Sequence, residues 1–149
     1  MERIKHYMWR TSPEVAITKF IEKNVAISVS DEVGRIIYAN NRFCTIIGSE
    51  ERELIGVNNS LFKTNMSREP FYKNLWETIE KGNIWKGVLS NKTNKGNLFW
   101  LETTIVPLKD DEGNVESFIA MYLDVTKAKI DSKKIEIQNQ NTHTLGDTA

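Results

Sequence analysis

Two turn signals in the second half of the chain restrict its fold more than any other feature. Three runs rich in β-branched and aromatic residues (84–91, 98–108 and 115–125) are separated by the segments 94–97 and 109–114, which are made mostly of asparagine, aspartate, lysine and glycine. Connections of this length join neighbouring strands in antiparallel order. The sequence therefore predicts a three-stranded meander.

An earlier pair of strands is predicted over 25–30 and 35–38, because the turn between them ends at Gly34. Two groups of antiparallel strands with short helical segments between them are typical of an α+β fold. We expect one five-stranded antiparallel sheet with short helices packed on one face.

Helix ends are marked by particular residues. Ser12 followed by Pro13 predicts the start of an N-terminal amphipathic helix over 13–23. Asn40 and Gly48 predict the start and the end of a second helix, since asparagine caps a helix N-terminus and glycine follows a helix C-terminus.

The chain divides into three parts. Residues 1–12 show no period and are expected to be a flexible lead, and residues 13–126 hold the folded domain. Residues 127–149 are polar and predict a C-terminal exit helix followed by a disordered tail from residue 141.

Composition argues against several functions. The chain carries 20 basic and 20 acidic side chains, so it has no basic footprint for nucleic acid, and its apolar runs are too short for direct membrane insertion. A single cysteine, Cys44, cannot form an internal disulfide, which favours a reducing, cytoplasmic setting. The sequence contains no Gly-x-Ser-x-Gly motif and no Walker-type loop, and no histidine lies in its central region to act as a base. We therefore expect the domain not to be an enzyme.

The strand over 84–91 carries the most informative pattern for function. Side chains alternate between faces, so Trp85, Gly87, Leu89 and Asn91 share one face. A buried amide needs partners for its donor and its acceptor, and a planar ligand with an imide-like edge would supply both. The alternative is a tryptophan that only fills the core and an asparagine that bonds the next turn. From this strand alone, both interpretations stand.

Several motifs occur together in a fixed order. They are Gly-Arg-Ile-Ile-Tyr-Ala-Asn at 34–40, Glu-Leu-Ile-Gly at 53–56, Lys95-Gly96, Pro107 and Asp-Val-Thr at 124–126. In this order the chain resembles a PAS sensory domain over roughly residues 13–130. Within that family it resembles the flavin-binding redox PAS domains of nitrogen-fixation regulators and, less closely, of the bacterial aerotaxis receptor.

The resemblance implies the positions of the cofactor contacts. Asn91 falls on the asparagine that bonds the isoalloxazine edge, and Ser28 falls on a first-strand serine near the flavin. Trp76 and Trp85 fall on tryptophans beside the cofactor.

Two positions depart from the family pattern. Asn59 stands where the redox-sensing relatives have a glutamate and the light-sensing relatives have their photoreactive cysteine, so a flavin–cysteine adduct is excluded. Tyr122 stands where the relatives have glutamine or histidine, and its phenol can still donate towards the ring.

The resemblance further implies a signal-transduction sensor that binds a non-covalent flavin, FAD being favoured over FMN, and reports redox or oxygen state to an output domain or partner signalling protein. The alternatives are a ligand-free dimerisation module and a sensor of another small metabolite. We also expect a homodimer, because Ile119, Met121 and Leu123 form an apolar outer sheet face that needs cover.

Overall fold

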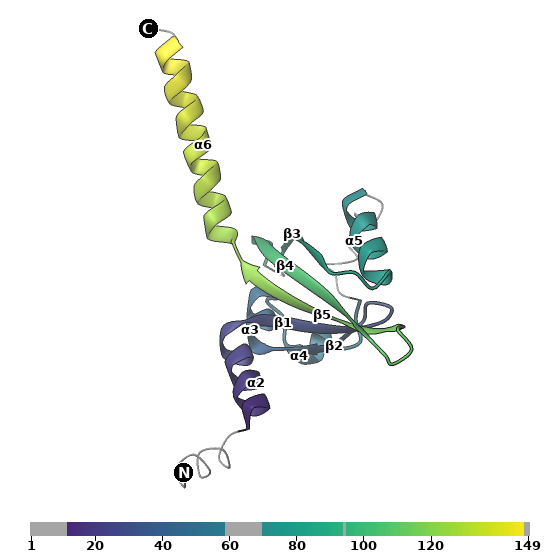
Figure 1. The fold of residues 1–149 in the computed structure, drawn as a ribbon. Helices are drawn as coiled ribbons and strands as arrows, with labels where there is room; N and C mark the ends of the chain where they lie inside the picture. Colours follow the sequence, from purple (N-terminus) through teal and green to yellow (C-terminus); the bar gives the residue numbers. More distant parts are fainter. Residues whose placement is uncertain (1–11, 59–69, 94, 148–149) are drawn as a thin grey trace, which may run out of the picture.

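The computed structural model describes residues 12–58, 70–93 and 95–147. Five strands form one antiparallel sheet in the order β2-β1-β5-β4-β3 (Figure 1). The strands are β1 (Ala26–Asp31), β2 (Ile36–Ala39), β3 (Trp85–Lys92), β4 (Leu98–Lys109) and β5 (Val115–Asp124). Both predicted strand groups are therefore present, and the pairing of β1 with β5 joins them into a single sheet.

Helices account for most of the remaining described chain. They are α2 (Pro13–Asn24), α3 (Asn41–Ile47), α4 (Glu51–Leu54), α5 (Pro70–Glu80) and α6 (Thr126–Asp147). The buried residues of α3 and α5 pack against one face of the sheet, which we call the inner face. This arrangement confirms the α+β fold with short helices on one face, an N-terminal helix and a C-terminal helix.

The predicted helix ends are confirmed by their hydrogen bonds. The Ser12 hydroxyl accepts from the backbone N–H of Val15 at 3.2 Å and so caps α2. The side-chain oxygen of Asn40 accepts from Phe43 N at 3.1 Å and from Ile27 N at 3.0 Å. Asn40 therefore caps α3 and also holds the start of β1.

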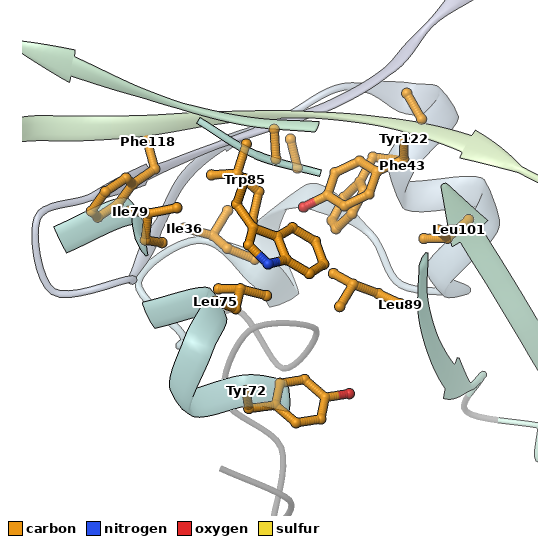
Figure 2. Close-up of a cluster of buried hydrophobic side chains, with 14 of the residues drawn as sticks. Ile36, Phe43, Tyr72, Leu75, Ile79, Trp85, Leu89, Leu101, Phe118 and Tyr122 are labelled. Atoms are coloured by element: carbon orange, nitrogen blue, oxygen red, sulfur yellow. The ribbon is translucent and has the colours of Figure 1, made fainter. Parts of the chain in front are cut away.

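The hydrophobic core lies between the inner face of the sheet and the helices α3 and α5. Figure 2 shows Trp85 near its centre, with Leu75 from α5 and Leu89 from β3 on either side. On β5, Phe118, Ala120 and Tyr122 are buried, whereas Met121 and Leu123 on the opposite face are 44% and 62% exposed. The sheet thus has the apolar outer face that the sequence pattern predicted.

Helix α6 is longer than expected. It runs to Asp147, so the prediction of a disordered tail from residue 141 is wrong for 141–147. No proline interrupts the chain after Thr126, and each added residue gains a helical hydrogen bond once a helix has started. Figure 1 shows α6 extending away from the sheet. Among the described residues, no helix combines the length and the apolar character needed to cross a bilayer.

Candidate functional site

The inner side of β3 has the alternation that the sequence predicted. Trp85 and Leu89 are buried, Gly87 and Asn91 are half-buried, and the residues between them are exposed. Because strand side chains alternate, these four residues face the helices. This inner side of β3 is the starting point of the candidate site.

The Trp85 side chain lies over Gly87, two residues further along the same strand. A Cβ atom added to Gly87 would lie only 2.5 Å from Cη2 of the Trp85 indole. The other side of the indole meets α5, where the Phe71 ring stands edge-on with its centroid 5.6 Å away. Any side chain at position 87 would therefore collide with the indole, and glycine is required by this close approach.

Ser28 and Tyr122 are brought together by the neighbouring strands β1 and β5. Ser28 on β1 is fully buried, and its hydroxyl is hydrogen-bonded to the Tyr122 phenol at 2.8 Å. The Tyr122 ring packs on Phe43 of α3 at a centroid distance of 4.8 Å. Two residues predicted from the family pattern thus form one buried polar pair in the core.

Asn91 lies apart from that pair. It pairs with Phe99 near the end of β3, whereas β4 and β5 separate β3 from the strand that carries Ser28. Its side-chain oxygen accepts a hydrogen bond from the backbone N–H of Lys92 at 2.8 Å. The amide therefore stands on the inner face with its oxygen turned to its own strand.

Trp76 lies at the end of the core that is next to the β1–β2 hairpin turn. Its ring would lie 2.6 Å from a Cβ at Gly34, and it meets Phe118 edge-on at a centroid distance of 6.2 Å. Trp76 is thus a wall of the core at the β1–β2 turn. Asn59, the sixth predicted site residue, lies outside the described residues.

Sequence reasoning missed two further buried hydroxyls, those of Ser30 on β1 and Thr103 on β4. Both are on the inner face. Ser30 shares the strand parity of Ser28, and Thr103 lies in the alternating apolar pattern of its strand, so parity was the signal that could have found them.

The junction between β5 and α6 is tied to β4 at Trp100. The backbone N–H of Trp100 donates to the Thr126 hydroxyl at 3.0 Å, and the Trp100 carbonyl accepts from Val125 N at 2.9 Å. The Lys133 ammonium lies 5.3 Å from the centroid of the Trp100 ring. Since Trp100 pairs with Ser90, the residue before Asn91, the exit helix is anchored beside the candidate site.

The titrating groups with shifted pKa values lie elsewhere. Burial, and then the hydrogen bond to Glu22, raise the pKa of Tyr38 to about 12. Burial, and then the charge of Glu51, raise the pKa of the Cys44 thiol, which keeps it protonated and a poor nucleophile. The described residues hold no group of three histidine, cysteine, aspartate or glutamate side chains that could bind a metal ion. The site therefore offers aromatic walls, hydroxyls and one amide.

Comparison with known protein families identifies this arrangement. The family model described as PAS domain matches residues 24–127, which include the whole sheet. The chain belongs to the PAS domain family. The five-stranded sheet and the short helices on its inner face, which lie within these residues, are thus those of a PAS domain.

Curated relatives of this PAS domain include signalling proteins. It is 29% identical over 125 residues to the nitrogen fixation regulatory protein of Klebsiella oxytoca, covering 84% of this chain and 25% of that protein. It is 23% identical over 113 residues to the aerotaxis receptor of Escherichia coli K12, covering 76% of this chain and 22% of the receptor. The chain thus spans about a quarter of the length of these relatives.

Solved structures show the same fold. The structure of an RNA-binding light-oxygen-voltage receptor superimposes with a TM-score of 0.70 at 23% sequence identity, covering 87% of this chain and 37% of the receptor. At this identity the likeness concerns the fold alone.

Proposed function

We propose that this PAS domain is a signal-transduction sensor whose inner sheet face binds a non-covalent flavin, with FAD favoured over FMN. The observation that carries the proposal is the space over Gly87, called the slot below, which the Trp85 indole occupies so closely that an added Cβ would lie 2.5 Å from it. A site that accepts one flat ring in this way has the shape that a planar cofactor needs. The family resemblance supports flavin as that cofactor and FAD as its form.

The residues around the slot fit a flavin. Gly87 on β3 pairs with Thr103 on β4, and Thr103 pairs with Tyr122 on β5. This row of cross-strand neighbours leads from the slot to the buried Ser28–Tyr122 pair. Asn91 adds an amide on the same face of β3. An aromatic enclosure with a few convergent polar groups is typical of cofactor sites. Rotation of the Trp85 side chain would open the slot to a ring.

In this proposal the chain's residues bind and orient the cofactor. The Asn91 amide bonds the polar edge of the ring, Ser28 and Tyr122 present hydroxyls from the neighbouring strands β1 and β5, and Trp85 and Trp76 form aromatic walls. Asn59 joins this set on the sequence pattern alone. A bound flavin supplies the redox chemistry, and the protein sets its environment. The domain then works as a redox or oxygen sensor and not as an enzyme.

We infer a route from this site to the exit helix. Asn91 and Ser90 face Phe99 and Trp100 across the β3–β4 ladder. The Trp100 backbone N–H donates to the Thr126 hydroxyl, and the Trp100 carbonyl accepts from the Val125 N–H. A change in the bond between the ligand and Asn91 would shift β3 against β4 and so change the anchor of α6. An output domain or partner signalling protein would receive this change in a cytoplasmic setting. This is a coupling hypothesis, which requires two distinct states of the junction.

A second candidate function is a ligand-free dimerisation module. Two observations favour it: the Trp85 indole fills the slot, and the Asn91 oxygen is bonded to Lys92 N. In that case the inner face is a filled hydrophobic core with no room for a ligand. The exposed apolar residues of α2 and of the outer sheet face then mediate dimerisation. A sensor of another small metabolite would use the same slot with a different ring.

Exchange of Asn91 tests the flavin proposal. In Asn91→Ala the ring's polar edge loses its partner, so the flavin dissociation constant should rise roughly tenfold while the sheet stays folded. Flavin fluorescence titration measures the affinity, and far-UV circular dichroism checks the fold. Ser90→Ala, an exposed neighbour on the other side of β3, is the matched control and should bind as the parent does. Equal affinities of parent and Asn91→Ala would contradict the assigned role.

A further inference from the structure

The Ser30 hydroxyl is buried without a hydrogen-bond partner in the part of the chain that the structure describes. The residue is only 1% exposed, so bulk water does not reach the oxygen. A buried hydroxyl that has lost its water and gained no partner costs free energy, and such groups are rare in folded proteins. Ser30 therefore needs an explanation.

The other buried hydroxyls of the inner face are satisfied. Ser28, two residues earlier on β1, is bonded to Tyr122, and Thr103 on β4 donates to the Leu101 carbonyl at 3.0 Å. The three residues have similar burial and face the same core. The fold thus provides protein partners for Ser28 and Thr103 and, among the described residues, provides none for Ser30.

Ser30 also lies between two predicted ligand contacts. Along β1 it follows Ser28 on the inner face, and across the sheet it pairs with Phe118, against which Trp76 stands. The β1–β2 register shift comes from an extra residue on β2, Ile37, whereas β1 pairs with β5 without interruption, so Ser30 keeps the same face as Ser28. The hydroxyl therefore borders the same interior as Ser28 and Trp76.

We propose that Ser30 is a ligand-contacting residue whose hydroxyl completes its hydrogen bonding only when a flavin occupies the inner face. This assignment rests on the proposed flavin binding and adds a specificity determinant at the β1 end of the site, opposite Asn91. It requires a ligand with a hydrogen-bonding atom at both ends of the interior. A purely hydrocarbon ring would leave the Ser30 hydroxyl unsatisfied and would be disfavoured.

Two serine-to-alanine variants test this role, because they should affect the empty protein in opposite ways. In the ligand-free protein, Ser30→Ala removes an unsatisfied group, so its melting temperature should equal or exceed that of the parent. Ser28→Ala should lower it, because it leaves the Tyr122 phenol without its bond to Ser28. In a titration with FAD, Ser30→Ala should raise the dissociation constant roughly tenfold. Stability equal to or above that of the parent, combined with a loss of affinity, is the signature of a ligand-facing hydroxyl.

Three results would overturn the inference, and they are distinguishable. If ligand-free Ser30→Ala is destabilised as much as Ser28→Ala, the Ser30 hydroxyl has a partner within the folded protein. If the parent binds FAD and Ser30→Ala binds it equally well, Ser30 makes no ligand contact while the proposed function stands. If the parent itself binds no FAD, the proposed function fails and this inference fails with it.

Discussion

At the scale of single residues, the contact between Trp85 and Gly87 determines how the interior is filled. The indole reaches its place over β3 only because residue 87 has no Cβ atom. A buried tryptophan contributes a large apolar area to the core, so this contact matters for stability as well as for the shape of the site.

Gly87→Ala should destabilise the domain by about 1–3 kcal/mol, since the new methyl group forces the indole out of its place. In a Trp85→Leu background the same change should cost much less, because the ring that it would strike is gone. Urea unfolding of the four proteins measures the coupling as a double-mutant cycle. Additive effects would show that the indole does not lie over Gly87.

The sequence predicted individual residues where strand parity or capping chemistry acts locally. Trp85 and Asn91 were placed on the inner side of β3 by parity, and Asn40 was predicted as a cap by its residue type. The bond between Ser28 and Tyr122 spans 94 positions, so no local pattern encodes it. The contact of the Trp85 ring with Gly87 was also missed, because parity gives the face of a side chain and not its rotamer.

At the scale of helices and strands, α2 is held to the domain by a few polar contacts. The Tyr38 phenol on β2 donates to the Glu22 carboxylate at 2.8 Å, and the Arg42 side chain donates to the Lys23 carbonyl. No residue of α2 is buried. The position of this helix therefore depends on hydrogen bonds more than on packing.

The Tyr38 contact predicts a pH dependence. The folded state raises the pKa of Tyr38 from 10.0 to about 12, so the neutral phenol is favoured on folding. The stability that this contributes is fully present below pH 10.0 and is lost as pH rises towards about 12. Tyr38→Phe should be less stable than the parent at neutral pH, and the difference should shrink above pH 10.0.

Urea unfolding at a series of alkaline pH values measures this difference. Glu22→Gln is the control that separates the hydrogen bond from the charge, because it keeps an acceptor for the Tyr38 phenol and removes the negative charge of Glu22. A gap between parent and Tyr38→Phe that stays constant across the alkaline range would show that the phenol does not titrate as the contact requires.

Element boundaries followed from turn residues and caps, whereas element lengths and packing partners did not. Gly48 ends α3 in a left-handed conformation with a φ of 80°, as its position in the sequence indicated. Helix α6 ends at Asp147. This end could not be predicted, because the polar composition after Ile137 neither favours nor breaks a helix. At the start of α4, Glu50 makes no side-chain cap bond.

At the scale of the whole molecule, two apolar surfaces remain exposed among the residues that the structure describes. On α2, Ile17 and Phe20 are 58% and 64% exposed, and on the outer sheet face Met121 and Leu123 are also open. Apolar surface gathered in this way on a small domain is typical of an interaction site. We therefore keep the proposal of a homodimer built from α2 and the outer sheet face.

The combined variant Phe20→Asp/Leu123→Asp should shift the dimer towards monomer, because burial of two carboxylates in an apolar interface is costly. Sedimentation velocity over a range of protein concentrations measures the shift. Ile55→Asp is the control, since Ile55 is 41% exposed and follows α4, on neither α2 nor the sheet. A parent chain that sediments as a monomer at high concentration would contradict the dimer.

Flavin binding requires that the interior of this PAS domain opens to admit the flavin ring. The most direct measurement is the flavin content of the full chain after incubation with excess FAD and removal of unbound cofactor, determined from the visible spectrum and by mass spectrometry of the heat-released cofactor. If the interior binds flavin, the protein will be yellow, with near-equimolar, non-covalent FAD that bleaches on anaerobic reduction and recovers in air. A colourless protein that releases no flavin would contradict flavin binding and would favour the ligand-free module, with the Trp85 indole as a permanent part of the core.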